Sequence, residues 1–320
     1  MINMPTARVS GPVLPTIFFF VLLVVLIIFY FFGTFGNIFS KTLSGTLYLG
    51  LAESGSFTSR LYQYNIKSKQ LEALQEPTFG ANSASVAPRG EELVFVGWEE
   101  TKNAQLYIID KTTGGFDQLT TDALRRKRTP QWSPDASRVA FTATESDSPD
   151  GVKDWGVYVS DLDGKVMKIA PGMYPLWLSP NRGLYLGEDG VYAFDIQNKA
   201  IGKVLPLEGG TATQSMRVAI SPDLKHFAWS VPGRGIIYVY DITSLDPLVL
   251  EKSKEITSSS FWVVFSPNGK YLAAQEVDWD TLETAPNPGI VAFGLKDNSR
   301  TELLDLSAYN QQAMFLSDWR

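Results

Sequence analysis

The chain has 320 residues, 44% of them hydrophobic, with no cysteine and a single histidine. The lack of cysteine excludes disulfides, thiolate metal sites, a cysteine nucleophile and lipid attachment at an N-terminal cysteine, and one histidine excludes a zinc site built on a histidine pair. The net charge is −6 with both signs mixed along the chain, which argues against a nucleic-acid partner because that function needs a basic stripe.

An apolar segment lies near the N-terminus. Residues 1–12 form a short tail, and residues 13–32 follow as an unbroken run without a charge. At 1.5 Å per residue this run spans about 30 Å, the thickness of a bilayer's hydrocarbon core. It is longer than the apolar core of a signal peptide, and no Ala-x-Ala follows it. We therefore predict a transmembrane signal anchor, with a cleaved leader as the alternative.

The charges that flank this segment set its expected orientation. Arg8 precedes the apolar run and Lys41 follows it. Arg8 and the α-amine favour a cytoplasmic N-terminus, which places the rest of the chain outside the cytoplasm, at the cell membrane. Residues 33–45 contain several Gly, Ser and Thr, and we expect a short linker that leads into one domain at 46–320.

A short motif recurs through this domain. Aligned on the serine, its copies are Ala87-Pro88-Arg89, Ser133-Pro134-Asp135, Ser179-Pro180-Asn181, Ser221-Pro222-Asp223 and Ser266-Pro267-Asn268. Successive copies are 42 to 46 residues apart. A period of this length is typical of β-propeller blades, each of which is a four-stranded sheet that buries its faces against its neighbours.

Each copy has the same internal order, which is clearest between residues 130 and 169. An apolar stretch with Trp132 ends at Ser-Pro-Asp, where proline fixes φ and the aspartate can bond nearby amides, so the chain turns. Three further strand-like runs follow, at 138–142, 156–160 and 166–169. The pattern of the third strand returns at 106–110, 191–195, 236–241 and 290–295.

The two ends of the domain complete one another. Residues 46–53, 60–65 and 70–74 look like three strands of a blade that lacks its first strand, and residues 314–319 look like a first strand without the other three. Together they make one blade. We predict an all-β fold, a six-bladed propeller of four-stranded antiparallel blades, closed by the C-terminal strand so that no sheet edge is left open.

These repeats resemble those of a known family. Trp132-Ser-Pro-Asp135, its shortened copies and the Val-Ala-Phe type of strand that follows are similar to the repeats of TolB-like, WD-repeat-like propellers and of the prolyl oligopeptidase propeller domain. The resemblance covers residues 46–319, and Ala87-Pro88-Arg89 departs from it. It implies a six-bladed propeller and says little about function, because such repeats serve scaffolds and lids over hydrolases alike.

Long charged loops supply the candidate binding residues. If the blades have the usual topology, the loops between second and third strands and the connections between blades share one face. We expect a partner to bind there, because propellers place binding sites on such loops. The candidates are Arg125, Arg126, Lys127 and Arg128 between blades two and three, Glu145, Asp147, Asp150 and Asp154 in blade three, and Asp278 and Asp280 in blade six. The alternative is a solvated rim whose acidic loop neutralises the basic run.

Two features invite a chemical interpretation that their context does not support. Asp161-x-Asp163-Gly164 matches only the start of a calcium loop and is also a plain hairpin turn. His226 would have to serve any Ser-His-Asp triad, yet no Gly-x-Ser-x-Gly elbow occurs, so we expect a half-buried strand residue. The sequence therefore predicts no catalytic residue, no metal site and no cofactor.

The function predicted from the sequence is that of a membrane-anchored, extracytoplasmic propeller. It would be a non-catalytic scaffold that binds a protein partner and is held to the membrane through residues 13–32. One alternative is a carbohydrate-active or other hydrolytic propeller that uses carboxylates at the channel mouth. Another is a binder of glycans or small ligands.

Overall fold

The computed structural model describes residues 43–53, 59–74, 80–98, 103–207, 211–258, 260, 262–276, 289–306, 309 and 311–320. The chain divides into two units, Met1–Leu43 and Ser44–Arg320. The predicted tail, the predicted membrane span at 13–32 and the linker up to residue 42 lie outside the described residues. Within the part that is described, no helix is long and apolar enough to cross a membrane.

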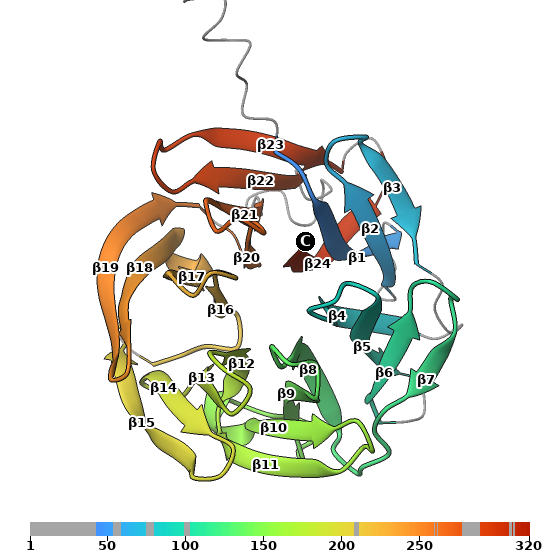
Figure 1. Cartoon of the computed structure of the whole chain (residues 1–320), viewed down its shortest axis with the longest axis vertical. Coiled ribbons are helices and arrows are strands. Elements are labelled where there is room, and N and C mark those ends of the chain that lie inside the picture. The colour runs from blue at the N-terminus through green and yellow to red at the C-terminus, as the bar shows by residue number, and fades with distance from the viewer. Residues whose placement is uncertain are drawn as a thin grey trace, which may run out of the picture. The chain divides into compact units, whose positions relative to one another are not determined.

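The second unit is a ring of six four-stranded antiparallel sheets (Figure 1). Blade one contains β24 (Gln311–Trp319), β1 (Thr46–Glu53), β2 (Arg60–Asn65) and β3 (Gln70–Ala73), blade two β4 (Gly80–Val86), β5 (Glu92–Trp98), β6 (Gln105–Asp110) and β7 (Phe116–Gln118), and blade three β8 (Arg126–Trp132), β9 (Arg138–Thr144), β10 (Gly156–Asp161) and β11 (Val166–Pro171). Blade four contains β12 (Met173–Trp177), β13 (Arg182–Leu186), β14 (Gly190–Asp195) and β15 (Lys199–Pro206), blade five β16 (Arg217–Ile220), β17 (His226–Val231), β18 (Ile236–Leu245) and β19 (Leu248–Thr257), and blade six β20 (Val263–Phe265), β21 (Tyr271–Glu276), β22 (Gly289–Gly294) and β23 (Arg300–Asp305). Two short 3-10 helices, η1 (Val152–Asp154) and η2 (Pro232–Arg234), lie between strands. The predicted fold and strand order are confirmed.

The recurring serine explains why blades three, five and six turn where they do. Ser133 Oγ donates to Asp135 Oδ1 at 2.6 Å and accepts the N–H of Arg138 at 3.0 Å, while Ala136 takes a φ of +57°. The same hydroxyl network forms at Ser221 and Ser266. The hydrogen bond from Ser133 lowers the pKa of the Asp135 carboxyl. The motif therefore fixes the turn from the first strand of a blade to its second.

The C-terminal strand closes the ring. Leu47 pairs with Trp319 in an antiparallel ladder, and Arg320 N–H donates to Thr46 O at 2.9 Å. The buried indole of Trp319 donates to Ser44 O at 3.0 Å. A Cβ at Gly50 would overlap the ring of Phe315, so only glycine lets this ring cross strand β1. The closure leaves no unpaired edge between the first and last strands of the domain.

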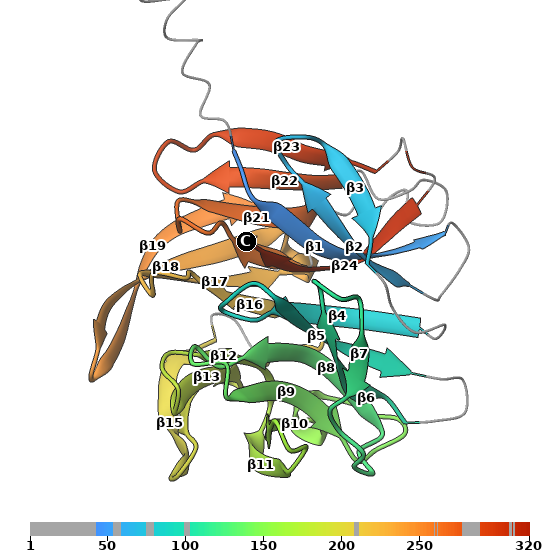
Figure 2. The ribbon, with the colours of Figure 1, turned by 45° about the vertical axis from the view of Figure 1, so that its right-hand side comes forward.

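The hydrophobic core lies between neighbouring blades. Val94 of blade two packs in one cluster with Phe141 of blade three, and Trp177 of blade four packs with Ala140 of blade three. No blade can bury its faces alone, which is why the repeat must continue around the ring. The hairpin of β18 and β19 is longer than the others and projects beyond its neighbours (Figure 2).

Candidate functional site

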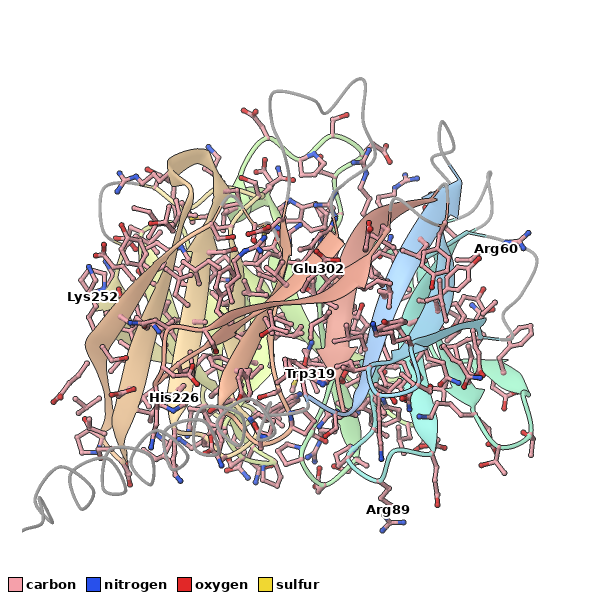
Figure 3. All side chains as sticks on the ribbon, turned by 90° about the horizontal axis from the view of Figure 1, so that it is seen from above. Arg60, Arg89, His226, Lys252, Glu302 and Trp319 are labelled. Carbon is pink, nitrogen blue, oxygen red and sulfur yellow. The ribbon has the colours of Figure 1, made fainter. Side chains whose placement is uncertain are left out.

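The ring has two distinct faces. We call the face with the Ser-Pro turns and the turns between third and fourth strands the turn face, and the opposite face the loop face. Arg89, in the first turn of blade two, lies at the lower face in Figure 3, and Arg60, at the start of β2, lies toward the upper face. The loop face carries the connections between blades and the loops between second and third strands, as the sequence predicts.

The predicted basic run is split between surface and interior. Arg126, Lys127 and Arg128 belong to strand β8 and not to the preceding connection. Arg125 Nε lies 3.5 Å from Asp147 Oδ1, and Arg126 Nη2 donates to the backbone oxygen of Asp147 at 2.7 Å. The acidic loop of blade three therefore faces both arginines and places a carboxylate beside Arg125, which is the arrangement of a solvated rim.

Lys127 is buried, with 1% of its surface exposed. Its Nζ donates to Ala104 O at 2.8 Å, Gln105 Oε1 at 3.0 Å and Asp122 Oδ1 at 2.9 Å. Burial lowers the pKa of its ammonium group, an effect that Asp122 opposes. Alternation along β8 turns Lys127 into the space between blades two and three, where it cannot meet a partner.

The four predicted acidic residues that the structure describes do not form a cluster that could hold a metal ion. Glu145, Asp147 and Asp150 are exposed, and Asp154 is half-buried at the end of η1, where its Oδ2 accepts the N–H of Asp150 at 2.7 Å. Glu145 contributes to the rise in the pKa of Tyr158, which reaches about 12 and is caused mainly by burial. Asp278 and Asp280 lie outside the described residues.

A cavity of about 320 Å³ occupies the central channel and reaches the turn face. Its wall is made by the innermost strands and by prolines of the turns, among them Pro88, Pro134 and Pro222. Aromatic side chains supply much of the remaining wall: Trp132, Tyr174, Trp177, Trp262, Phe265 and Trp319. The charged residues of the described wall are Arg217, Asp318 and Arg320. Concave, aromatic surfaces with a few polar groups are typical of binding sites.

The backbone of this cavity is strained at equivalent points of three blades. Ser83, Thr129 and Tyr174 have positive φ of 35°, 47° and 57°, and each lies at a β-bulge in an innermost strand. The Thr129 N–H donates to Ser83 Oγ at 3.0 Å, and the Tyr174 N–H donates to Thr142 Oγ1 at 2.8 Å. Hydroxyls of the preceding blade thus hold the bulged amides, and strain of this kind clusters at functional sites.

Four side chains from similar positions in their blades lie near the inner end of the cavity. Arg128, Tyr174, Arg217 and Trp262 each stand four or five residues before the turn serine of their blade. The Arg217 guanidinium lies between two rings, 4.7 Å from the centre of Tyr174 and 4.1 Å from that of Trp262. Arg128 lies 4.6 Å over the ring of Trp155 and does not line the cavity. We call these four residues the axial cluster.

All the hydrogen bonds that the structure shows for the Arg217 side chain are made by one nitrogen, Nη1. Its Nη1 donates to the Tyr174 hydroxyl, to Gln214 O at 2.6 Å and to Met216 O at 2.8 Å. Its Nε and Nη2 have no partner among the described residues, and neither Arg217 nor Arg128 is within salt-bridge distance of a described carboxylate. Burial lowers the pKa of both guanidinium groups.

The two features with an uncertain chemical role have structural ones. Asp161 Oδ1 accepts the N–H of Asp163 at 3.1 Å and of Lys165 at 2.9 Å, which makes a hairpin turn. His226 is half-buried at the start of β17, with Nδ1 2.8 Å from Asp241 Oδ1. The structure thus shows the hairpin turn at Asp161 and the half-buried strand position of His226 that the sequence predicts. In the described ranges, no three His, Asp or Glu side chains gather in a way that could hold a metal ion.

Comparison with known proteins identifies the fold. No protein-family model and no curated protein sequence matches the chain. TolB from Acinetobacter baumannii is similar in structure, with a TM-score of 0.61 and 16% identity over 87% of this chain and 67% of TolB. An oligogalacturonate lyase in complex with manganese has a TM-score of 0.55 and 12% identity, over 82% of this chain and 74% of the lyase. A chain of a nidogen/laminin complex has a TM-score of 0.62 and 10% identity, over 85% of this chain and 98% of that one. At such identities the similarity shows the fold alone, and that fold is a TolB-like six-bladed β-propeller.

Proposed function

We propose that the protein is a non-catalytic binding module in which a segment of a partner protein docks in the channel cavity from the turn face. The observation that carries this proposal is the set of bulged residues Ser83, Thr129 and Tyr174, whose strained backbone shapes one aromatic cavity. The rim residues Arg125 and Arg126 are less suited to the role, because Asp147 already faces them. A preformed cavity lowers the ordering cost of binding.

A matched pair of variants tests docking in the cavity. Val264 is half-buried in the cavity wall, and Thr301 is exposed on β23, the outermost strand of the same blade. Val264→Trp fills the cavity, and Thr301→Trp adds the same bulk outside it. Quantitative mass spectrometry of proteins co-purified from solubilised membranes should show a partner lost with Val264→Trp and kept with Thr301→Trp. Identical profiles for both variants would contradict docking in the cavity.

We also propose that residues 13–32 anchor the propeller at the cell membrane with the propeller outside the cytoplasm. The length of the apolar run and the position of Arg8 support this topology. Because the chain has no cysteine, Ser68→Cys at the exposed turn of blade one introduces a single thiol. An impermeant maleimide should label it in intact cells, in the membrane fraction. Labelling only after lysis would reverse the orientation, and a soluble labelled product would indicate cleavage.

Hydrolysis at the channel is the alternative from another class. A mechanism with two carboxylates needs both in one pocket. Asp318 is the carboxylate of the described cavity wall, and its Oδ2 accepts the Val86 N–H at 3.0 Å and the Arg320 Nε–H at 3.1 Å. Turnover of a polysaccharide that Asp318→Asn abolishes would favour this alternative over the docking module.

A further inference from the structure

The axial cluster contains two positive charges that the described part of the chain does not balance. Arg217 and Arg128 both interact with Tyr174, and the positive charge of Arg128 disfavours that of Arg217. The Tyr174 hydroxyl accepts a hydrogen bond from Arg217, and Tyr174 raises the pKa of both guanidinium groups. Burial raises the pKa of Tyr174, so the phenol stays neutral although both arginines favour its ionised form.

Neither arginine can relieve this repulsion by losing its proton, because a guanidinium stays charged in proteins. Stacking of Arg217 on Trp262 and of Arg128 on Trp155 offsets part of the desolvation. Both arginines are half-buried, and the Nε atom of Arg217 is fully buried without a partner. A charge that is removed from water is usually paired, and leaving it unpaired is destabilising. An arrangement of this kind is expected where the missing counter-charge arrives with a ligand.

Extending the proposed function, on which this inference rests, we propose that the inner end of the channel cavity is a carboxylate-binding subsite. Arg217 pairs there with the carboxylate of the docked ligand, and Arg128 adds a second positive charge without touching it. Arg217 lines the cavity and its Nη1 is already occupied by three oxygens, which leaves the N–H groups of Nε and Nη2 as donors. So small a number of free donors suits a planar carboxylate better than a phosphate group, because the three or more oxygens of a phosphate need more partners.

The chemistry of the cavity allows two sources for this carboxylate. One is an acidic side chain on a peptide segment of the partner, and the other is a small free acid such as a sugar acid. The aromatic wall near Arg217 suits either, because Tyr174 and Trp262 present flat apolar surfaces beside the charge. The probes must therefore separate the two sources.

The test is thermal unfolding of the full-length protein in detergent with two pairs of probes at equal ionic strength. The first pair is acetyl-glutamate amide and acetyl-glutamine amide, and the second is sodium D-galacturonate and methyl D-galactoside. Ligands that bind only the folded state raise Tm, and we expect a rise of about 2–4 °C at ten times Kd. A rise with the glutamate probe alone assigns the carboxylate to a peptide, and a rise with galacturonate alone assigns it to a free acid. No rise beyond that of sodium chloride with either acid overturns the subsite.

Variants connect the shift to Arg217. Arg217→Gln should abolish the rise, and Arg217→Lys, which keeps the charge without the planar fork, should reduce it. Arg182→Gln is the control, because Arg182 is a half-buried arginine outside the cavity that pairs with Asp246 at 3.7 Å. A rise that persists in Arg217→Gln overturns the proposal. If Val264→Trp loses the partner while Arg217→Gln keeps it, docking in the cavity stands and the carboxylate subsite falls.

Discussion

The guanidinium carbon of Arg217 lies 4.1 Å from the centre of the Trp262 ring, although the two residues come from different blades. Arg217 begins the innermost strand of blade five, and Trp262 directly precedes that of blade six. The ring of Trp262 also meets Phe315 of blade one at 6.2 Å, edge to face. This contact links three blades at the inner end of the channel.

Replacement of this ring should therefore cost stability as well as binding. We expect Trp262→Leu to lower the free energy of unfolding by about 1–3 kcal/mol, because it removes a partly desolvated cation–π contact and an aromatic pair. Denaturant unfolding measures the change. Phe116→Leu, at a side chain that is 42% exposed, is the control and should stay within about 0.5 kcal/mol of the wild type. Equal effects of the two substitutions would show that the contact is energetically neutral.

Asp122 and Lys127 form a buried ion pair, and substitution of the two partners should lower the free energy of unfolding by different amounts. Asp122→Ala leaves the Lys127 ammonium buried with only neutral oxygens around it and should cost about 3–5 kcal/mol. Lys127→Met removes the buried charge and should cost much less. Denaturant unfolding of both variants and of the double variant gives the coupling between the two residues. A larger loss from Lys127→Met than from Asp122→Ala would contradict this account.

Lys127 also predicts a pH dependence on the alkaline side. Its pKa in the folded protein is lowered from 10.5 by burial, so between the lowered value and 10.5 the unfolded chain binds more protons than the folded one. Stability contributed by this group therefore rises with pH across that interval. The difference in unfolding free energy between wild type and Lys127→Met should shift in favour of the wild type as pH approaches 10.5. A shift in the opposite direction would show that the pKa is raised.

The first turn of blade two lacks the serine hydroxyl of the other turns, and substitution can supply it. Ala87 N–H donates to Glu92 O at 2.9 Å, as Ser133 N–H donates to Arg138 O at 2.8 Å, but Ala87 has no hydroxyl. Ala87→Ser with Arg89→Asp should add the missing hydrogen bonds and stabilise the protein by about 0.5–1.5 kcal/mol. Ser133→Ala, the reverse change, should cost about 1–3 kcal/mol because it leaves polar groups unpaired. Thermal unfolding checks both, and a loss of stability in the double variant would contradict the role given to the motif.

Ring closure should depend on the last strand. Trp319 is 1% exposed and its indole N–H is bonded to Ser44 O. We expect Trp319→Ala to lower the free energy of unfolding by about 3–5 kcal/mol, since it opens a cavity and weakens the packing where β24 pairs with β1. Hydrogen exchange should then rise first in β1 and β24. A uniform rise in exchange across all blades would argue that the pairing of β24 with β1 is no weaker than the rest of the ring.

The sequence predicts the fold well because the fold is encoded locally. Ser-Pro turns occur in four of the six blades, and the hydroxyl network of such a turn needs only residues within five positions of one another, as Ser133 and Arg138 show. Closure is visible for the same reason, since the C-terminal stretch ends in a strand without the other three. The boundaries of β1 and β2 coincide with the predicted runs at 46–53 and 60–65.

The site is harder to predict because it is assembled across blades. The run from Arg125 to Arg128 suggests a surface patch, yet the burial of Lys127 depends on Ala104 and Gln105 of another blade. Arg217 stands alone in the sequence and becomes notable only when the first strands are aligned. Its position, four residues before Ser221, matches that of Trp262 before Ser266. Comparison of equivalent positions among repeats is the signal that finds the axial cluster.

The central claim is that a partner protein enters the channel, and crosslinking from inside the cavity tests it most directly. A photoreactive phenylalanine analogue at position 264 of the full-length protein probes the cavity wall, and the same group at position 301 probes the outer surface of the same blade. In intact cells, the account predicts a discrete crosslinked protein from position 264 that position 301 does not give. The same products from both positions, or none from position 264, would contradict it.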